Sequence, residues 1–493
     1  MSELCNEDLA PVPMDKRTWN TLNYFSLWVG MAVCIPSYMI ASSLITAGMS
    51  LWQAIGCVFL GNIIVLVPMV LNGKVGAQYG IPYPVFARSS FGILGSNIPA
   101  LLRAVVACGW FGIQTWIGGM AVMAVIKAFW PGFAEIPNIF PEWFGTSTAP
   151  FISFLIFWAM NVVIILKGVQ TIKWFETASA PLLLISGIAL LFWAMTRVSN
   201  IEGSFGAGMA RLFDQPSNFQ TSAEFWKVFI PSLTGMVGFW ATMSLNIPDF
   251  TRYAKDQKSQ FWGQVFGLPT TMTLFALIGV VVTNATVVIF GSAIWDPVMV
   301  VEKFDSPFLL FISMIIITIA TLSTNIAANV VGPANDFSNA MPSKINFKRG
   351  GMLTACLGVI MMPWKLIADP SGYIFTWLIG YSSLLGPIGG ILLVDYFIIR
   401  KEKLNVDDLY KRQGEYTFYK GFNFAAIVAF VVGVLPNVPG FMHQIGMNAS
   451  ISSFFETIYS YAWFVGLPLS GVVYFALMKL NSMTERSAAN AEL

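Results

Sequence analysis

Charged residues are scarce in this sequence. Asp, Glu, Lys and Arg together make up 11% of its 493 residues, whereas soluble globular domains carry about 25%. Hydrophobic residues make up 56%, and the mean hydropathy is +0.69. This composition excludes an ordinary soluble protein and indicates an all-α polytopic membrane protein. The net charge of +2 gives no basis for a nucleic-acid partner.

Histidine and cysteine are also rare. The single histidine, His443, falls in a predicted loop. The five cysteines are scattered, without the spacing of a metal site or a disulfide framework: Cys5, Cys34, Cys57, Cys108 and Cys356. No Ser-His dyad, carboxylate pair or metal cluster is visible, so we expect no catalytic role and no resident cofactor.

Acidic residues are missing from the middle of the predicted membrane spans. The carboxylates within or near spans all lie close to cytoplasmic span ends: Glu176, Asp249 and Asp395. A proton relay through the bilayer centre would need an ionisable side chain there. This absence favours Na⁺, bound by neutral oxygens, as the coupling ion, with proton coupling as the alternative.

Long apolar runs are what the sequence has in abundance. A membrane-spanning helix needs about 20 predominantly apolar residues, and twelve such runs occur: residues 24–45, 51–72, 98–128, 149–167, 174–196, 228–248, 261–290, 306–331, 351–367, 372–398, 422–442 and 454–478. Of the 27 Lys and Arg residues, 21 fall on the side of the N-terminus and six on the other: Lys127, Arg197, Arg211, Lys227, Lys303 and Lys365. The positive-inside rule then places both termini in the cytoplasm. We expect a multi-pass protein of a bacterial cell membrane, without a cleavable signal peptide.

The longest stretch between spans separates five spans from seven. A second block of five spans would insert upside down relative to the first, as in transporters built from inverted repeats. The predicted organisation is a cytoplasmic tail (1–22), a first repeat of five spans (23–197), an outer linker (198–226), a second repeat (227–400), a cytoplasmic loop (401–421), two further spans (422–480) and a cytoplasmic tail (481–493).

Each predicted repeat opens with a span that contains a proline, Pro36 in the string CIPSY and Pro248 in the string NIPDF. Proline removes a helical hydrogen bond, and in hydrocarbon the freed carbonyl must find another partner. Broken helices at matching positions of two repeats indicate a mid-membrane site, whereas a plain proline kink is the alternative. In the second repeat we expect the break near Gly235 and Gly238, because Pro248 lies close to the end of its span.

The third span carries polar and aromatic side chains at its centre, in the string GWFGIQTW (residues 109–116). Trp110 and Gln114 are four residues apart and share one helical face, and an amide that faced lipid would be unfavourable. An indole can stack on a flat heterocycle, and an amide offers that ring a paired donor and acceptor. We predict a site for a polar, uncharged ring, with helix packing as the alternative and as the preferred interpretation for Trp116.

Spans six and eight add to this predicted site. Phe239 and Trp240 could close on the other face of the ring, although ordinary core packing explains them equally well. Asn329 would supply a second amide. Asp249 and Arg252, at i and i+3, are interpreted as a structural pair rather than as part of the site.

Span eight also contains two adjacent hydroxyl residues, Ser323 and Thr324, each one helical turn from Ala320. Hydroxyl and carbonyl oxygens suit a small hard cation. Hydrogen bonding of each hydroxyl back to its own helix is the ordinary alternative.

Taken together and in this order, these strings resemble the nucleobase:cation symporter-1 family. The resemblance covers nearly the whole chain and includes the strings NGKVGAQYGIPYPVFARSSFGILGSNIPALLRA, NIPDFTRYAK and STNIAANVV. It implies a leucine-transporter-like fold of twelve helices, ten in a five-plus-five inverted repeat and two C-terminal. It also implies alternating access between a bundle (spans 1, 2, 6 and 7) and a hash motif (spans 3, 4, 8 and 9).

The resemblance also assigns roles to residues. The implied substrate-binding residues are Trp110, Gln114, Phe239, Trp240, Asn329 and, in span one, Cys34. The sodium site of the family's hydantoin carrier corresponds to the main-chain carbonyls of Gly30, Val33 and Ala320 and the hydroxyls of Ser323 and Thr324. Two positions depart from the family: Cys34 stands where the hydantoin carrier has Gln, and Gln114 stands where plant relatives have Glu. The first departure argues against a hydantoin, and the second prevents transfer of a proton mechanism that uses the Glu.

Within the family the sequence is most similar to uracil and purine carriers. We therefore expect a secondary active transporter that imports a nucleobase, uracil first and purines next, by cation symport. The alternatives are an allantoin or hydantoin permease of the same fold, a proton-coupled carrier and, more remotely, a membrane sensor that binds a base without moving it. The expected partners are the substrate, the coupling cation and the lipid bilayer, with no obligate protein partner.

Overall fold

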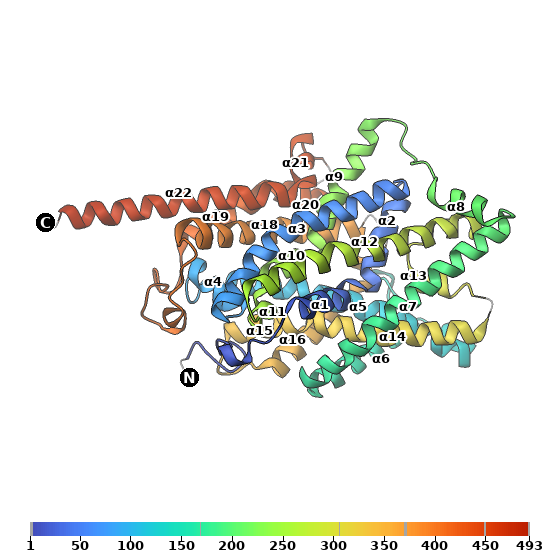
Figure 1. The fold of residues 1–493 in the computed structure, drawn as a ribbon, viewed down its shortest axis with the longest axis horizontal. Helices are drawn as coiled ribbons and strands as arrows, with labels where there is room; N and C mark the ends of the chain where they lie inside the picture. Colours follow the sequence, from blue (N-terminus) through green and yellow to red (C-terminus); the bar gives the residue numbers. More distant parts are fainter. Residues whose placement is uncertain (1–2, 168, 305, 369–371, 448–449, 492–493) are drawn as a thin grey trace.

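The computed structural model describes residues 3–167, 169–304, 306–368, 372–447 and 450–491. Throughout this part of the chain the regular structure is helical, apart from two isolated bridges, Trp19–Ala254 and Tyr419–Phe422. The long helices run beside one another along the long axis of the molecule (Figure 1). The all-α membrane fold that the composition predicts is confirmed.

The principal helices coincide with the predicted spans. They are α1 (Thr21–Ala32) with α2 (Ile35–Thr46), α3 (Leu51–Tyr79), α5 (Asn97–Phe129), α6 (Thr148–Lys167), α7 (Val169–Ile201), α9 (Ser222–Phe239) with α10 (Ala241–Asn246), α12 (Gln257–Phe290), α14 (Pro307–Asn329), α16 (Phe347–Ile360), α18 (Ile379–Leu393), α19 (Phe424–Val434) and α22 (Ala462–Ala491). Among the described residues, nine helices are long and apolar enough to cross a bilayer, and the bent pair α1–α2 makes a tenth. The two remaining predicted spans, the sixth and the ninth, correspond to the interrupted α9–α10 and to the shorter α16.

Shorter helices connect these spans or cover their ends. They include α4 (Tyr83–Phe91), α8 (Phe205–Phe213), α11 (Pro248–Thr251), α13 (Pro297–Val301), α15 (Val331–Ala340), α17 (Pro363–Leu366), α20 (Val438–Gln444) and α21 (Ser453–Ser460).

The first predicted span is interrupted near its centre, where α1 and α2 meet at a bend of 60°. Pro36 stands in the first turn of α2, where its missing amide removes no helical bond. In a continuous helix the amide of Cys34 would donate to the carbonyl of Gly30, but here it donates to the carbonyl of Ala32 at 3.0 Å. The chain therefore breaks before the proline rather than kinking at it, and the Gly30 carbonyl loses its helical partner.

The sixth predicted span is interrupted as well. The break falls at Trp240, two residues beyond Gly238. Side chains of neighbouring helices bond the main-chain carbonyls around it, because Tyr381 donates to the Gly238 carbonyl at 2.8 Å and Asn72 donates to the Ser244 carbonyl at 2.7 Å. Both predicted repeats thus open with a broken helix, and the second break lies close to where the glycines placed it.

Asp249 and Arg252 do not form an ion pair within the described residues, so their predicted pairing was wrong. Asp249 accepts hydrogen bonds from the Tyr83 amide at 2.9 Å and from the Asn246 side chain at 3.3 Å. The first bond places the carboxylate at the N-terminus of α4, where the helix dipole favours negative charge. Arg252 instead donates to the carbonyl of Asp8 at 2.7 Å. Each residue therefore ties a different segment to the end of α11.

A buried ion pair between α5 and α15 was not foreseen from the sequence. Nη1 of Arg103, on α5, lies 3.3 Å from Oδ2 of Asp336, on α15, and both side chains are fully buried. The close approach of the guanidinium to the backbone requires a glycine at position 332, because a Cβ there would collide with it. Removing one partner of such a pair leaves an uncompensated buried charge, so this pair joins α5 firmly to α15.

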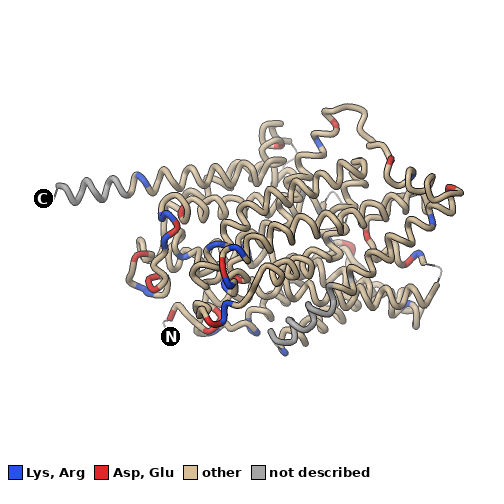
Figure 2. Tube along the Cα trace, viewed as in Figure 1, with Lys and Arg blue, Asp and Glu red and all other residues tan. Residues whose placement is uncertain are grey.

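Most Lys and Arg residues gather at the end of the molecule where the N-terminus lies (Figure 2). The segment predicted as an N-terminal tail packs against that end. Arg88 donates to the carbonyl of Leu4 at 2.8 Å, and the hydroxyl of Tyr410 donates to the carbonyl of Leu9 at 2.8 Å. The beginning of the chain is therefore part of the folded structure at this end.

The close approach of α5 and α16 gives a test of the packing. A Cβ at Gly112 would lie 2.5 Å from the carbonyl oxygen of Gly358, whereas a Cβ at Gly56 would meet nothing within 4 Å. Overpacking of this kind destabilises by about 1–3 kcal/mol, so Gly112→Val should lower the thermal unfolding midpoint of the purified protein well below that of Gly56→Val. Equal midpoints for the two variants would contradict the helix contact.

Candidate functional site

A small cavity lies where the two helix breaks meet α5 and α14. Ten residues line it: Met31, Cys34, Trp110, Gln114, Phe239, Trp240, Thr242, Met243, Ala328 and Asn329. All six residues predicted to bind the substrate are among them. These ten residues, all in the described part of the chain, include no charged side chain, so the cavity suits a neutral molecule.

Aromatic side chains form one wall of the cavity. Phe239 packs edge-to-face against Trp110, with ring centroids 5.2 Å apart, and against Trp240, at 5.0 Å. Trp28 of α1 supports Trp240 from behind in another edge-to-face contact at 5.0 Å. Phe239 therefore contacts both indoles that were predicted to hold a ring between them.

The amide of Asn329 is positioned by a buried polar network. Its Nδ2 donates to Oδ1 of Asn325 at 3.0 Å. Asn325 in turn donates to Oγ1 of Thr115 at 3.0 Å and to Oδ1 of Asn161 at 3.2 Å. The network holds Asn329 in one orientation at the cavity wall, with its own oxygen not committed to Asn325.

Two other polar atoms at the cavity are buried without a hydrogen-bond partner within the described protein. They are Oε1 of Gln114, an acceptor, and Nε1 of Trp240, a donor. An unsatisfied buried polar group costs about 1–3 kcal/mol, and such groups are uncommon in native structures. A polar guest with both donors and acceptors would satisfy them.

The cavity is too small for a heterocyclic ring in this state. Its volume is about 30 Å³, about a tenth of the lower end of the range for ligand pockets, which is about 300 Å³. A ring can enter only if lining side chains move apart, and Phe239, which contacts both indoles, is one of them. The structure therefore represents a compact form of the site rather than the open sandwich that the sequence suggested.

The predicted cation ligands lie where α1 packs against α14. Gly30 and Val33 belong to the interrupted end of α1, whose carbonyls lack the continuation of the helix. On α14 the hydroxyl of Thr324 donates to the carbonyl of Ala320 at 3.1 Å, which is the ordinary back-bonding alternative. Ser323 is buried beside it.

This donor set consists of neutral oxygens. Among the described residues there is no group of three or more His, Cys, Asp or Glu side chains that could hold a metal ion. Carbonyl and hydroxyl oxygens match the preference of a hard cation and not that of a transition metal. The residues present therefore fit an alkali cation.

Several residues around the cavity were missed by the sequence analysis. The cavity wall also includes Met31, Thr242, Met243 and Ala328. Behind Trp110 lie Trp377, at a ring-centroid distance of 6.1 Å, and Tyr381, at 6.5 Å. The i, i+4 spacing of Trp377 and Tyr381 in the string WLIGY was the available signal. Trp116 packs on Trp364 at 5.5 Å, in line with its interpretation as a packing residue.

Broken helices in two repeats around a neutral cavity define a leucine-transporter-like membrane protein, and comparison with solved structures supports that class. The chain superposes on the inward-facing conformation of Mhp1 with a TM-score of 0.77 and 24% sequence identity, covering 98% of this chain and 95% of that one. It also superposes on Mhp1 in a closed conformation with bromovinylhydantoin bound, with a TM-score of 0.75, 24% identity and coverage of 98% and 96%. The shared fold is that of a polytopic, all-helical membrane protein.

Sequence comparison then identifies the family. Residues 11–466 match the model of a family described as permease for cytosine/purines, uracil, thiamine, allantoin. The chain is 45% identical to the purine-uracil permease NCS1 of Arabidopsis thaliana, over 96% of this chain and 78% of the relative. It is 41% identical to the allantoin permease of Bacillus subtilis (strain 168), over 97% and 94%. The chain belongs to this family, the nucleobase:cation symporter-1 permeases, and is a multi-pass membrane transporter.

The polar network behind Asn329 gives a test of the site. Asn325→Leu keeps a similar volume but removes the bonds to Thr115, Asn161 and Asn329, and each lost buried bond destabilises by about 1–3 kcal/mol. We expect a lower thermal midpoint and a raised KM for uptake, because Asn329 loses its fixed orientation. Asn200→Leu, at an exposed position, is the matched control and should change neither quantity. An unchanged KM in Asn325→Leu would show that the network does not position the site.

Proposed function

We propose that the protein imports a nucleobase, uracil first and purines next, by symport with a cation. The observation that carries this proposal is the set of lining residues: two indoles, a phenyl ring and two amides around an uncharged cavity. Planar uncharged bases offer a π-face for the aromatic side chains and an edge of alternating donors and acceptors for the amides. The 45% identity to a purine-uracil permease of Arabidopsis thaliana supports the same substrate class.

Gln114 and Asn329 would divide recognition between them. Oε1 of Gln114 is a buried acceptor without a protein partner, so it suits a ring N–H. The side-chain NH₂ group of Asn329 donates to Asn325, which leaves the side-chain oxygen of Asn329 as a second acceptor. Uracil carries two ring N–H groups and two carbonyls, and the indole N–H of Trp240 is available as a donor to one of those carbonyls. A substrate without N–H groups would leave both acceptors unpaired, and such mismatches weaken binding strongly.

Transport requires this site to open and close. The cavity lies between segments that correspond to the family's bundle (α1, α2, α9 and α10) and its hash motif (α5 and α14). Phe239 and Trp240 sit at the break of the sixth span, where few helical bonds constrain the backbone. We propose that substrate binding draws these aromatics around the ring and shifts the population between conformations by its differential affinity for them.

The coupling ion in this proposal is Na⁺. The carbonyls of Gly30, Val33 and Ala320 with the hydroxyls of Ser323 and Thr324 would hold it, and bound there it would supply positive charge where α1 meets α14. The Gly30 carbonyl, which has lost its helical donor, is the feature of the chain that fits a cation best.

The proposed direction of transport is uptake, driven by the ion gradient across the membrane. Lys and Arg cluster at the end where the N-terminus lies (Figure 2), and the positive-inside rule places such an end in the cytoplasm. A Na⁺ gradient directed inward would then drive uptake.

A second candidate substrate is allantoin, because a Bacillus subtilis allantoin permease is 41% identical over nearly the whole chain. Allantoin is also neutral and rich in N–H and carbonyl groups, but it is not a flat aromatic ring.

Competition of labelled uracil uptake by unlabelled uracil, adenine, allantoin and hydantoin separates these cases. Uracil should compete best, and stronger competition by allantoin would make the protein an allantoin carrier. Counterflow in proteoliposomes distinguishes a carrier from a non-transporting sensor, which shows none.

The substrate assignment predicts the effect of removing the second amide. Asn329→Ala should abolish saturable uracil uptake while leaving the thermal midpoint within a few degrees of the parent, because the lost side chain donates one hydrogen bond, to Asn325, and lines the cavity. Asn200→Ala, at an exposed position, serves as the control and should transport normally. Normal uptake by Asn329→Ala would overturn the site assignment.

The ion assignment predicts a different signature. Replacing both hydroxyls, Ser323→Ala with Thr324→Ala, should remove the Na⁺ dependence of uptake in proteoliposomes. Thr318→Ala removes a comparable hydroxyl that back-bonds on the same helix, to the carbonyl of Met314 at 2.7 Å, and should leave Na⁺ dependence intact. If wild-type uptake ignores Na⁺ and collapses with a protonophore, coupling is to H⁺ and the sodium site is refuted.

A further inference from the structure

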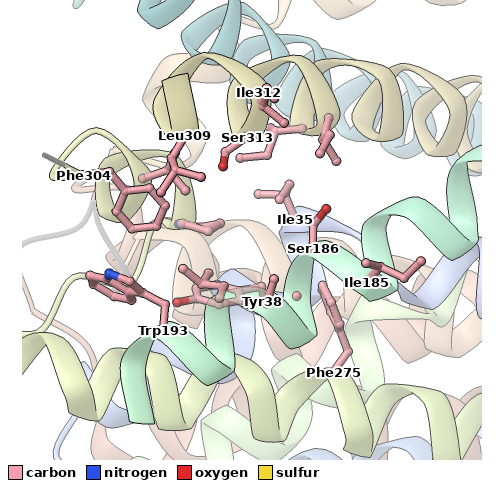
Figure 3. A pocket seen from close by; sticks show the side chains of 17 residues that line it. Ile35, Tyr38, Ile185, Ser186, Trp193, Phe275, Phe304, Leu309, Ile312 and Ser313 are labelled. Atoms are coloured by element: carbon pink, nitrogen blue, oxygen red, sulfur yellow. The ribbon is translucent and has the colours of Figure 1, made fainter. Parts of the chain in front are cut away.

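A second, larger cavity lies away from the candidate site and shares no lining residue with it. Its volume is about 330 Å³, which is within the range of ligand pockets. Its walls come from α2 (Ile35, Tyr38), α7 (Trp193), α12 (Phe275) and α14 (Ile312). Figure 3 shows these side chains arranged around an open space between the helices.

The lining of this cavity is almost entirely hydrocarbon. The hydroxyl groups among its lining residues belong to Tyr38, Ser186 and Ser313, and Ser186 already donates to the carbonyl of Leu182 at 2.8 Å. No amide or charged side chain lines it within the described part of the chain. A nucleobase would leave its polar edge unsatisfied there, and a cavity of this character does not hold ordered water.

One end of the cavity continues into a hollow of a different chemical kind. This second hollow, of about 480 Å³, is lined by Arg197, Lys303, Thr196 and Ser306 among others. Trp193, Phe304 and Leu309 line both spaces, and the rings of Trp193 and Phe304 pack 4.9 Å apart between them. An apolar chamber is thus joined through an aromatic neck to a mouth with two cationic and two hydroxyl side chains.

The composite space is accessible from the membrane. Ile185 on α7 is 63% exposed and Leu309 on α14 is 53% exposed, and both line the apolar chamber. The basic mouth lies at the end of α7 and the beginning of α14, far from the N-terminus in Figure 1. Basic side chains at the end of a span stand at the level of the phosphate groups of a bilayer.

We propose that this space is a binding site for one anionic phospholipid, with an acyl chain in the apolar chamber and the phosphate between Arg197 and Lys303. The occupant follows from charge complementarity at the mouth, hydrocarbon in the chamber and the open side toward the bilayer. Glu302 is paired with Lys127 at 3.5 Å, and the two charges of Arg197 and Lys303 exceed that of Asp305, which adjoins the lining residue Phe304 in the sequence. The proposal does not depend on which substrate the protein carries.

The site would also influence conformation. Its walls combine α2 and α12, which correspond to the family's bundle, with α14 of the hash motif and with α7, the last span of the first repeat. An acyl chain inserted there fills space between elements that move relative to each other during alternating access. Lipid occupancy therefore stabilises the present arrangement of these helices over one in which they separate.

Native mass spectrometry of the delipidated protein, titrated with dioleoylphosphatidylglycerol or dioleoylphosphatidylcholine, tests the proposal. The wild type should retain one phosphatidylglycerol more tightly than phosphatidylcholine, by about fivefold per basic side chain at the phosphate. Lys303→Gln should reduce this preference, because it weakens phosphatidylglycerol more than phosphatidylcholine, whose choline already offsets the charge of its phosphate. Lys227→Gln, an exposed lysine that lines neither space, is the charge control. Equal affinity for both lipids in the wild type would overturn the assignment of the headgroup.

A second pair of variants tests the chamber. Ala189 lines it, whereas the neighbouring Ile188 does not, so Ala189→Phe fills the space and Ile188→Phe adds a ring outside it. Ala189→Phe should weaken both lipids by about tenfold or more, with Ile188→Phe unchanged. The wild-type protein can also be tested with a phosphatidylglycerol that carries a photoactivatable diazirine in its acyl chain. This lipid should label residues of α7 and α14 that line the chamber. Labelling confined to other helices, or full lipid retention by a folded Ala189→Phe, would overturn the proposal.

Discussion

A polypeptide in hydrocarbon must provide a hydrogen-bond partner for every backbone N–H and C=O group from within the protein. The two broken helices are the places where the regular helical bonds are lost and other partners are needed. At the second break, Tyr381 and Asn72 donate to main-chain carbonyls from neighbouring helices. At the first break, the Gly30 carbonyl has lost its helical donor because the Cys34 amide turns to Ala32. The breaks therefore leave main-chain carbonyls without helical partners inside the membrane-spanning part of the fold. The candidate site lies beside these carbonyls.

The candidate site and the larger apolar cavity have opposite chemistry, although Cys34 and Ile35 are adjacent in the chain and line one each. The smaller cavity combines aromatic faces with amide groups and suits a neutral polar ring. The larger one combines hydrocarbon walls with a basic mouth and suits a lipid. Both lie between helices of the bundle and helices of the hash motif, so occupancy of either acts on the same relative motion. A transporter built in this way can respond to its membrane as well as to its substrate.

The sequence was sufficient for the helices and for six of the residues that line the candidate cavity. Apolar runs locate the spans, and the spacing of Trp110 and Gln114 places them on one helical face. Contacts between segments that are distant in the chain could not be predicted from the sequence. The pairing of Arg103 with Asp336 depends on how α5 and α15 meet, and no local pattern reveals it.

For Asp249 and Arg252 the helical spacing was correct and the pairing was not, because the Tyr83 amide and the Asp8 carbonyl offered better partners. The small size of the cavity likewise reflects tertiary packing, because Phe239 packs against the rings of Trp110 and Trp240.

The central claim is that a planar base binds between Trp110 and Trp240 after Phe239 has moved aside, with Gln114 and Asn329 at its edge. An experimental structure of the protein in nanodiscs with uracil and Na⁺ tests it most directly. The account predicts ring density between the two indoles, with both amide side chains within hydrogen-bond distance of the ring and Phe239 displaced from its present contacts. Uracil bound elsewhere, with the contacts of Phe239 to both indoles unchanged, would contradict it.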